Sequence, residues 1–133
     1  MGWKSSSHAK WDCKYHVVWC YKRRKRIGDA EVRKFEEALL RRIGEEFGME
    51  IDTLEVSEDH VHLFVMIPPR YSVGKAVGIM KSISASRVFS RYPWLRDQFW
   101  SGELWEDGYC VRTVGDHVTA QTVRWYIKRH KEE

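Results

Sequence analysis

Two histidines separated by one apolar residue, His60 and His62, have the clearest potential for chemistry in this sequence. Side chains two residues apart in a β-strand point to the same face, so both imidazoles would stand side by side while Val61 points into the core. Imidazole binds many divalent transition metals, and catalytic metal sites keep coordination positions open. The pair is therefore predicted to form half of a divalent-metal site. The alternative interpretation is two polar residues on the solvated face of an antiparallel strand.

A tyrosine and a third histidine near the C-terminus could act together with that pair. Tyr126 and His130 are four residues apart in a segment with helical periodicity, which places the phenol and the imidazole on one helix face. If His130 binds the metal, Tyr126 lies where a metal-bound phosphate would be. These residues then predict a metal-assisted tyrosine nucleophile. Alternatively, Tyr126 is an aromatic residue of the helix's packing face.

The strands that position these side chains are predicted by runs of apolar residues. Alternation of apolar and polar residues over 11–21 indicates a first strand. Two apolar runs at 49–56 and 60–67 indicate a hairpin, and its second strand holds the histidines. A fourth strand is predicted over 108–114.

Three helices are predicted between and after the strands. Asp29 is a good N-cap for a long amphipathic helix that Gly48 stops. Ser72 can cap a second helix, which Pro93 ends because the residue before a proline is disfavoured in helical conformation. The last helix contains Tyr126.

The resulting order, βαββαβ followed by one more helix, predicts an α+β fold. A ferredoxin-like antiparallel sheet with two packed helices, plus a C-terminal helix carrying the tyrosine, is the simplest arrangement for this order. With 133 residues, the chain is expected to form one domain, residues 1–133.

Apolar content and cysteine spacing indicate the cellular compartment and the state of the cysteines. No apolar run reaches the roughly 20 residues that a membrane span needs, and residues 1–10 lack the apolar centre of a signal peptide, so we expect a cytoplasmic protein with no membrane partner. The three cysteines, Cys13, Cys20 and Cys110, form no close pair. They therefore indicate buried thiols in place of a disulfide framework or a four-cysteine zinc site.

The cations are unevenly distributed along the chain. The formal net charge of +4 is modest, but residues 22–26 are five consecutive cations. Such a block either contacts phosphates or forms a solvated loop. Trp19 and Tyr21 stand close by, and cations beside aromatic residues are typical of grooves that bind single-stranded nucleic acid. Nucleic acid is therefore a candidate partner.

Five segments, spread in order over nearly the whole chain, resemble one known family. The segments are Tyr15-His16-Val17-Val18-Trp19-Cys20, Ser57-Glu58-Asp59-His60-Val61-His62-Leu63-Phe64-Val65, Lys81-Ser82-Ile83-Ser84-Ala85-Ser86-Arg87, Leu104-Trp105-Glu106-Asp107-Gly108-Tyr109 and Thr122-Val123-Arg124-Trp125-Tyr126-Ile127. Together they resemble the HUH-class single-tyrosine transposases of small bacterial and archaeal insertion sequences, including the related transposases that act on repetitive extragenic palindromes.

The resemblance implies an activity and a set of site residues. His60 and His62 would bind Mg²⁺ or Mn²⁺, and Tyr126 would be the nucleophile that cleaves and rejoins single-stranded DNA through a 5′-phosphotyrosine. In many family members, a glutamine four residues after the tyrosine completes the coordination sphere. Here that position is His130, which we expect to be the third ligand. Asp59 is a candidate to orient one of the imidazoles.

The resemblance also implies partners. Family members are homodimers that recognise imperfect hairpins near the ends of the element, often with the tyrosine helix of one subunit completing the metal site of the other. We expect the same here. Phosphate contacts that position the DNA are expected from Arg23, Arg24, Lys25, Arg26, Lys81 and Arg87.

Two other functions stay open at this level. One is a non-catalytic nucleic-acid-binding module on the same ferredoxin-like sheet, with aromatic residues stacking on bases. The other is a stand-alone or domesticated HUH nickase, which would share the cleavage chemistry but not the strand exchange. Relaxases of that kind are usually larger than this chain.

Overall fold

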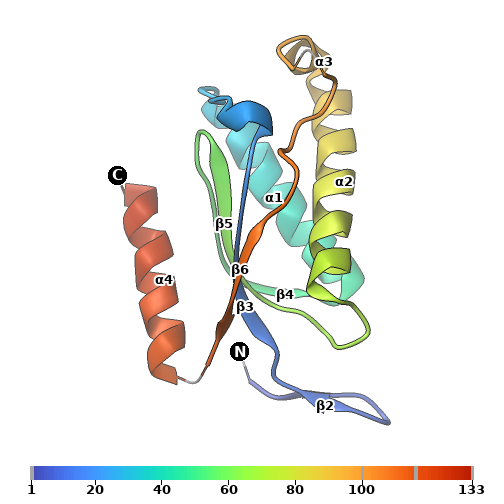
Figure 1. Cartoon of the computed structure of the whole chain (residues 1–133), viewed down its shortest axis with the longest axis vertical. Coiled ribbons are helices and arrows are strands. Elements are labelled where there is room, and N and C mark those ends of the chain that lie inside the picture. Colours follow the sequence, from blue (N-terminus) through green and yellow to red (C-terminus); the bar gives the residue numbers. More distant parts are fainter. Residues whose placement is uncertain (1, 100, 116, 133) are drawn as a thin grey trace.

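A four-stranded antiparallel sheet forms the centre of the molecule (Figure 1). The computed structural model describes residues 2–99, 101–115 and 117–132, and the side chains of residues 117–120 and 130–132 lie outside this description. The order of the strands in the sheet is β4-β5-β3-β6. Their bounds are β3 (Lys14–Cys20), β4 (Glu50–Val56), β5 (His60–Met66) and β6 (Cys110–Val114).

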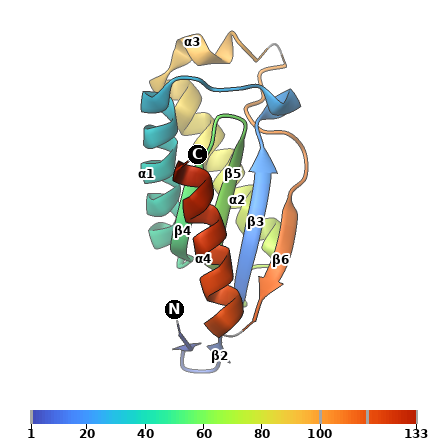
Figure 2. The ribbon, with the colours of Figure 1, turned by 90° about the vertical axis from the view of Figure 1, so that its left-hand side faces the viewer.

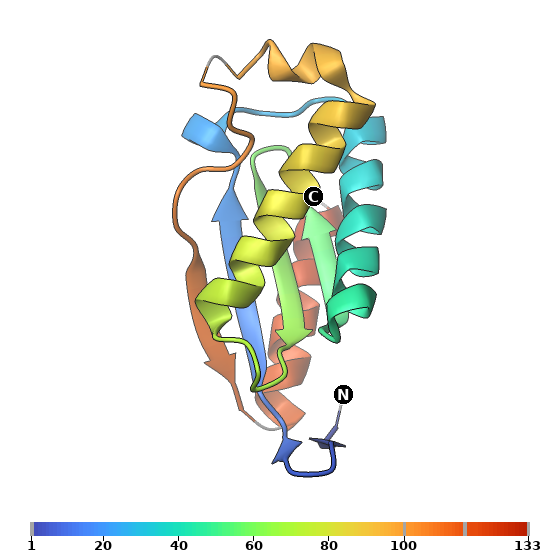
Figure 3. The same cartoon turned by 90° about the vertical axis from the view of Figure 1, so that its right-hand side faces the viewer.

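Helices cover both faces of this sheet. The long helices α1 (Ala30–Phe47) and α2 (Val73–Arg91) lie side by side on one face, as Figure 3 shows. Helix α4 (His117–Glu132) crosses the opposite face in front of β4 and β5 (Figure 2) and contacts both strands. The α+β class, the antiparallel sheet and the C-terminal helix carrying Tyr126 are thus confirmed.

Both long helices begin and end at the residues that the sequence predicts. The Asp29 carboxylate accepts a hydrogen bond from the N–H of Glu31 at 2.9 Å, and the hydroxyl of Ser72 accepts one from the N–H of Lys75 at 3.0 Å. These side chains satisfy backbone donors that the first helical turn leaves without partners. Gly48 ends α1 in the left-handed conformation, with φ of 73°, which glycine adopts without steric cost.

The main core lies between the sheet and the pair α1 and α2. Alternate residues of β3 and β5 point into it, including Val17, Trp19, Val61 and Leu63, all of them buried. The other face of β5 is also covered, because α4 packs there. Phe64, Val114 and Ile127 form a second small apolar cluster, with Val123 packed against it. The face that holds the histidines is therefore not a simple solvated face.

Some features of the structure were not predicted. A short hairpin of β1 (Lys4–Ser5) and β2 (Lys10–Trp11) precedes β3, so the first strand of the central sheet begins at Lys14. A single 3₁₀ turn, η1 (Lys22–Arg24), and the short helix α3 (Pro93–Arg96) also occur.

The cysteines and the helices bear on two expectations from composition, that the thiols are buried and that no segment spans a membrane. Cys13 and Cys20 are half-buried and Cys110 is exposed, so the expectation of three buried thiols is wrong. In the part of the chain that the structure describes, none of the helices combines the length and apolar character needed to cross a bilayer.

Candidate active site

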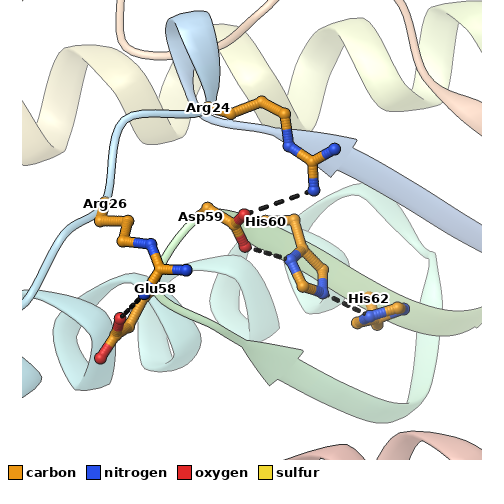
Figure 4. Close-up of polar contacts among 6 residues, drawn as sticks. All are labelled: Arg24, Arg26, Glu58, Asp59, His60 and His62. Atoms are coloured by element: carbon orange, nitrogen blue, oxygen red, sulfur yellow. Dashed lines mark hydrogen bonds and ion pairs between the residues drawn. The ribbon is translucent and has the colours of Figure 1, made fainter.

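His60 and His62 meet on the α4 side of the central strand β5. Their Nε2 atoms lie 2.6 Å apart, with the ring centroids separated by 4.4 Å (Figure 4). The side chain of His60 is 20% exposed, and His62 as a residue is 5% exposed. The strand thus holds both rings with their Nε2 atoms facing each other at hydrogen-bond distance.

Asp59 orients the first of these imidazoles. One carboxylate oxygen of Asp59 lies 2.5 Å from Nδ1 of His60, on the ring edge away from His62. Burial alone would raise the pKa of Asp59, but the hydrogen bond from His60 and the charges of His60 and Arg24 outweigh it and hold this pKa below its ordinary value. An ionised carboxylate can only accept, so Nδ1 of His60 carries a hydrogen, and in the neutral imidazole Nε2 then presents its lone pair.

This donor set fits a divalent cation. Two imidazole nitrogens converge, and a carboxylate behind one ring fixes the tautomer and raises the basicity of the ligand, as at known metal sites. Among the side chains that the structure describes, no three His, Cys, Asp or Glu residues are grouped closely enough to hold a metal ion. The expected third ligand, the side chain of His130, lies outside the described residues.

Tyr126 projects from α4 toward the histidine pair of its own chain. Its ring centroid lies 5.9 Å from that of His62, with an interplanar angle of 76°. The residue is 44% exposed, whereas Ile127 beside it is fully buried. The interpretation of Tyr126 as a packing residue is therefore wrong, and the phenol is accessible at the site.

His16 on β3 also belongs to the site, although the sequence analysis did not predict it as a site residue. Its ring stacks on that of His62 at 5.7 Å with an interplanar angle of 9°, and it meets the Tyr126 ring edge-on at 6.2 Å. Burial, and then the charge of Arg112, lowers the pKa of His16. A signal was present in the sequence, because His16 occupies the polar side of the alternating first strand.

A cavity of about 530 Å³ opens beside these rings. It is bounded by β3, β6 and α4, and His16, His62, Arg112 and Tyr126 are among the residues that line it. The candidate nucleophile and one candidate metal ligand therefore face a space that a substrate can enter.

The basic segment, residues 22–26, lies beside the turn that precedes β5 and its two histidines. The residues on either side of it are joined to that turn by backbone hydrogen bonds, from Tyr21 to Asp59 at 3.0 Å and from Ile27 to Glu58 at 2.7 Å. Arg24 pairs with the Asp59 carboxylate at 3.3 Å, as drawn in Figure 4. Contacts run from Arg24 through Asp59 to His60, so the segment predicted to bind DNA is connected to the candidate metal site.

The two expected DNA contacts on α2 differ in their surroundings. The ammonium group of Lys81 donates to the carbonyls of Glu106 at 2.7 Å and Gly108 at 3.0 Å, so it also holds the loop before β6. Arg87 is exposed. Arg23, Arg24 and Arg26 are exposed as well, and Lys25 is half-buried.

An antiparallel sheet that presents a histidine pair on one strand, beside a tyrosine on a helix, is the arrangement of an HUH-class single-tyrosine transposase. Comparison with known proteins agrees. The family model described as "Transposase IS200 like" matches residues 9–130, and this chain belongs to that family.

Individual relatives are similar over most of their length. The ISDra2 transposase TnpA of Deinococcus radiodurans is 36% identical over 119 residues, covering 90% of this chain and 85% of the relative. The transposase for the insertion sequence element IS200 of Salmonella typhimurium is 35% identical over 130 residues, which cover 98% of this chain and 84% of the relative.

Two solved structures are similar in fold. The crystal structure of a Deinococcus radiodurans R1 protein described as a transposase has a TM-score of 0.77 at 35% identity. The match covers 95% of this chain and 96% of the chain in that crystal structure. A REP-associated tyrosine transposase bound to a REP hairpin has a TM-score of 0.59 at 11% identity. The match covers 92% of this chain and 70% of that structure. At that identity, the second similarity shows the fold alone.

Proposed function

We propose that this transposase cleaves and rejoins single-stranded DNA at the ends of an insertion sequence, with Tyr126 as the nucleophile. The observation that carries the proposal is the position of an accessible phenol beside two imidazoles whose Nε2 atoms converge. His60 and His62 would hold the cation, and the side chain of His130 is proposed as the third ligand from its position in the sequence.

The proposed reaction exchanges one phosphodiester for another. The Tyr126 oxygen attacks the scissile phosphorus in line and loses its proton, while the bond from phosphorus to the 3′ oxygen breaks and that oxygen gains a proton. The products are a 5′-phosphotyrosine and a free 3′-hydroxyl. Attack by a 3′-hydroxyl on the phosphotyrosine reverses the bond changes and seals a new junction. Because the number of phosphodiester bonds is unchanged, no nucleotide triphosphate is required.

The described residues supply the remaining functions of the site. A neutral phenol is a weak nucleophile that needs activation. A bound Mg²⁺ or Mn²⁺ would polarise the phosphate and stabilise the charge that develops on it. Asp59 keeps His60 in the tautomer that can bind the cation. Exposed cations of the basic segment are close enough to His60, through Asp59, to hold the DNA backbone near the reacting phosphate.

We also propose that the DNA carries hairpins and that the protein acts as a homodimer. The solved REP-associated tyrosine transposase is bound to a hairpin, which supports the first point by similarity of fold. β6 lies at one edge of the sheet, and Cys110–Thr113 are exposed along it, which supports pairing with a second copy. Exchange of α4 between the copies is predicted by the family resemblance, whereas the described chain brings Tyr126 to its own His62.

The proposal is tested by trapping the covalent intermediate. Single-stranded oligonucleotides carrying the palindromes that flank the gene are incubated with the protein and Mg²⁺ or Mn²⁺, and the protein–DNA adduct is detected on a denaturing gel. Tyr126→Phe should abolish the adduct and leave hairpin affinity within about twofold, because only the attacking oxygen is removed. Tyr109→Phe, at a tyrosine that is 41% exposed, is the matched control and should still form the adduct.

The outcomes separate the candidate functions. Cleavage by the Tyr126→Phe protein would show that another residue is the nucleophile. If the unaltered protein binds hairpins but forms no adduct with any of several metals, the non-catalytic nucleic-acid-binding module is the better function.

A further inference from the structure

Helix α4, which carries Tyr126, is held on the sheet in part by apolar contacts. Val123 and Ile127 pack with Phe64 of β5 and Val114 of β6. Apolar burial favours contact but is non-directional. These contacts therefore keep the helix on the sheet and set which face it buries, but they restrain its rotation less tightly than a directional hydrogen bond would.

Arg124 makes a directional contact between this helix and the sheet. Its Nε and Nη2 atoms donate to the two carboxylate oxygens of Asp52 on β4 at 2.8 Å and 2.9 Å. The guanidinium carbon also lies 5.4 Å from the centroid of the Phe64 ring. A bidentate arginine–carboxylate pair fixes orientation as well as contact. The side chains are 31% and 17% exposed, so the pair is better shielded from water than a surface ion pair.

Asp52 lies at an irregularity in the pairing of β4 with β5. The pairing of β4 with β5 shifts between Ile51 and Thr53, which makes Asp52 the extra residue of a β-bulge. Bulges re-aim side chains and are frequent near active sites. The Thr53 hydroxyl donates to the same carboxylate at 2.6 Å. Burial would raise the pKa of Asp52, but the hydrogen bonds from Arg124 and Thr53, with the charge of Arg124, lower it overall.

We propose that Asp52 and Arg124 are positioning residues for the nucleophile: their bidentate pair sets the rotation of α4 so that Tyr126 points at His62. Arg124 and Tyr126 are two residues apart and so project about 200° apart around the helix. A rotation that releases Arg124 from Asp52 therefore swings Tyr126 away from the histidine pair. This inference rests on the proposed function, because it takes Tyr126 as the nucleophile.

The first test measures the rate of adduct formation at saturating DNA and Mn²⁺. Arg124→Ala and Asp52→Asn should each slow this step by about 10- to 100-fold, the range expected when a reacting group is misplaced by about 1 Å. Hairpin and Mn²⁺ affinities should stay within about twofold. Lys128→Ala removes one cation from an exposed position of the same helix and is the matched control. Arg124→Lys keeps the charge without the fork, so it should rescue only part of the rate.

Reversing both charges tests whether Arg124 and Asp52 act on the reaction rate through their contact with each other. Arg124→Asp and Asp52→Arg should each be slow, and the double reversal should be about tenfold faster than either because opposite charges face each other again. A double variant no faster than the single variants would overturn the proposal. So would a rate loss that disappears at saturating DNA, since Arg124 would then act on DNA binding.

A second readout does not depend on cleavage. Backbone amide exchange in α4, residues 121–129, should be faster in Arg124→Ala and Asp52→Asn than in Lys128→Ala, while exchange in α1 is unchanged. Equal exchange in all three would overturn the proposal. If exchange differs as expected but no protein forms an adduct, the proposed function fails and the positioning of α4 by this pair stands.

Discussion

The ring of Tyr126 lies 5.9 Å from the ring of His62 in the same chain, although 64 positions separate them in the sequence. This approach exists because α4 folds back across the face of the sheet that displays the histidines. An exposed phenol and two converging imidazoles in one chain are the relationship on which the proposed chemistry depends.

Replacing His60 by alanine should weaken metal binding and cleavage together. One of the proposed imidazole ligands is removed, so we expect Mn²⁺ affinity, measured by calorimetric titration, to fall by at least about tenfold, because even the loss of a partner behind a ligand costs that much. The adduct rate should fall in parallel at fixed metal concentration. Full activity in the His60→Ala protein would remove this assignment of the metal site.

Asp59 should matter through His60. We expect Asp59→Asn to lower Mn²⁺ affinity by about 10- to 100-fold, because the imidazole loses the charged acceptor behind it. Glu58→Gln is the matched control: it alters the neighbouring acid, which pairs with Arg26 at 3.3 Å. The same calorimetric titration applies to both. Equal affinities for the two variants would mean that the carboxylate at Nδ1 has no part in metal binding.

The exposed cations should act on DNA affinity and on its salt dependence. Arg24→Ala and Arg87→Ala should each lower hairpin affinity and reduce the slope of log K against log salt by roughly 0.7–0.9 for each DNA phosphate that is no longer neutralised. Arg42→Ala, at an exposed position of α1, should leave the slope unchanged. Binding is followed by fluorescence anisotropy from about 50 to 300 mM salt, the range over which such phosphate interactions weaken. Unchanged slopes in both variants would move the DNA-binding surface elsewhere.

Mixing two inactive proteins tests whether one chain supplies its own nucleophile. Tyr126→Phe has the histidine pair without the nucleophile, and His60→Ala has the reverse. Because the described chain brings Tyr126 to its own His62, we expect the mixture to stay inactive. Recovery of about a quarter of the unaltered activity would show instead that α4 is exchanged, since half of random dimers are mixed and each then has one complete site.

The core contains a titrating group that should make stability depend on pH. Glu36 is fully buried and accepts a hydrogen bond from the hydroxyl of Tyr21. Burial raises its pKa to about 8, although the hydrogen bond from Tyr21 and the charge of Arg33 oppose the shift. A carboxyl with a raised pKa stabilises the fold fully only below its unfolded pKa of roughly 4.3, and that contribution is lost as pH rises toward about 8.

Glu36→Gln should remove this pH dependence, because the amide still accepts from Tyr21 but does not titrate. Relative to the unaltered protein, the variant should gain stability by on the order of 5 kcal/mol between about pH 4.5 and pH 8, since each unit of pKa shift is worth about 1.4 kcal/mol. Urea unfolding at several pH values measures the difference, with Glu46→Gln on the exposed side of α1 as the control. A difference that does not change with pH would show that Glu36 does not titrate in this range.

Local patterns predicted the elements and part of the site. The alternation around His60 and His62 predicted that both rings share a strand face, since that depends only on the two-residue period of a strand. The caps Asp29 and Ser72 were predicted because capping is a contact between residues two or three positions apart. The role of Asp59 beside His60 is equally local.

Contacts between distant segments were decided by tertiary structure alone. His16 joins the site because β3 lies next to β5, and Asp52 meets Arg124 because α4 crosses a bulge in β4. In the sequence, His16 is one polar residue in an alternating strand, and Arg124 is one cation among many. Periodicity shows which face of an element is apolar, but not which other element covers it.

The sequence by itself therefore determined the four strands of the central sheet, the three long helices and the residue types able to do chemistry, because these follow from spacing along the chain. Only the folded chain decided that α4 covers the histidine face, that His62 is buried there, and that Tyr126 stays exposed beside it. The physical reason is that packing brings together side chains that are far apart in the sequence, and local spacing does not specify which distant side chains will meet.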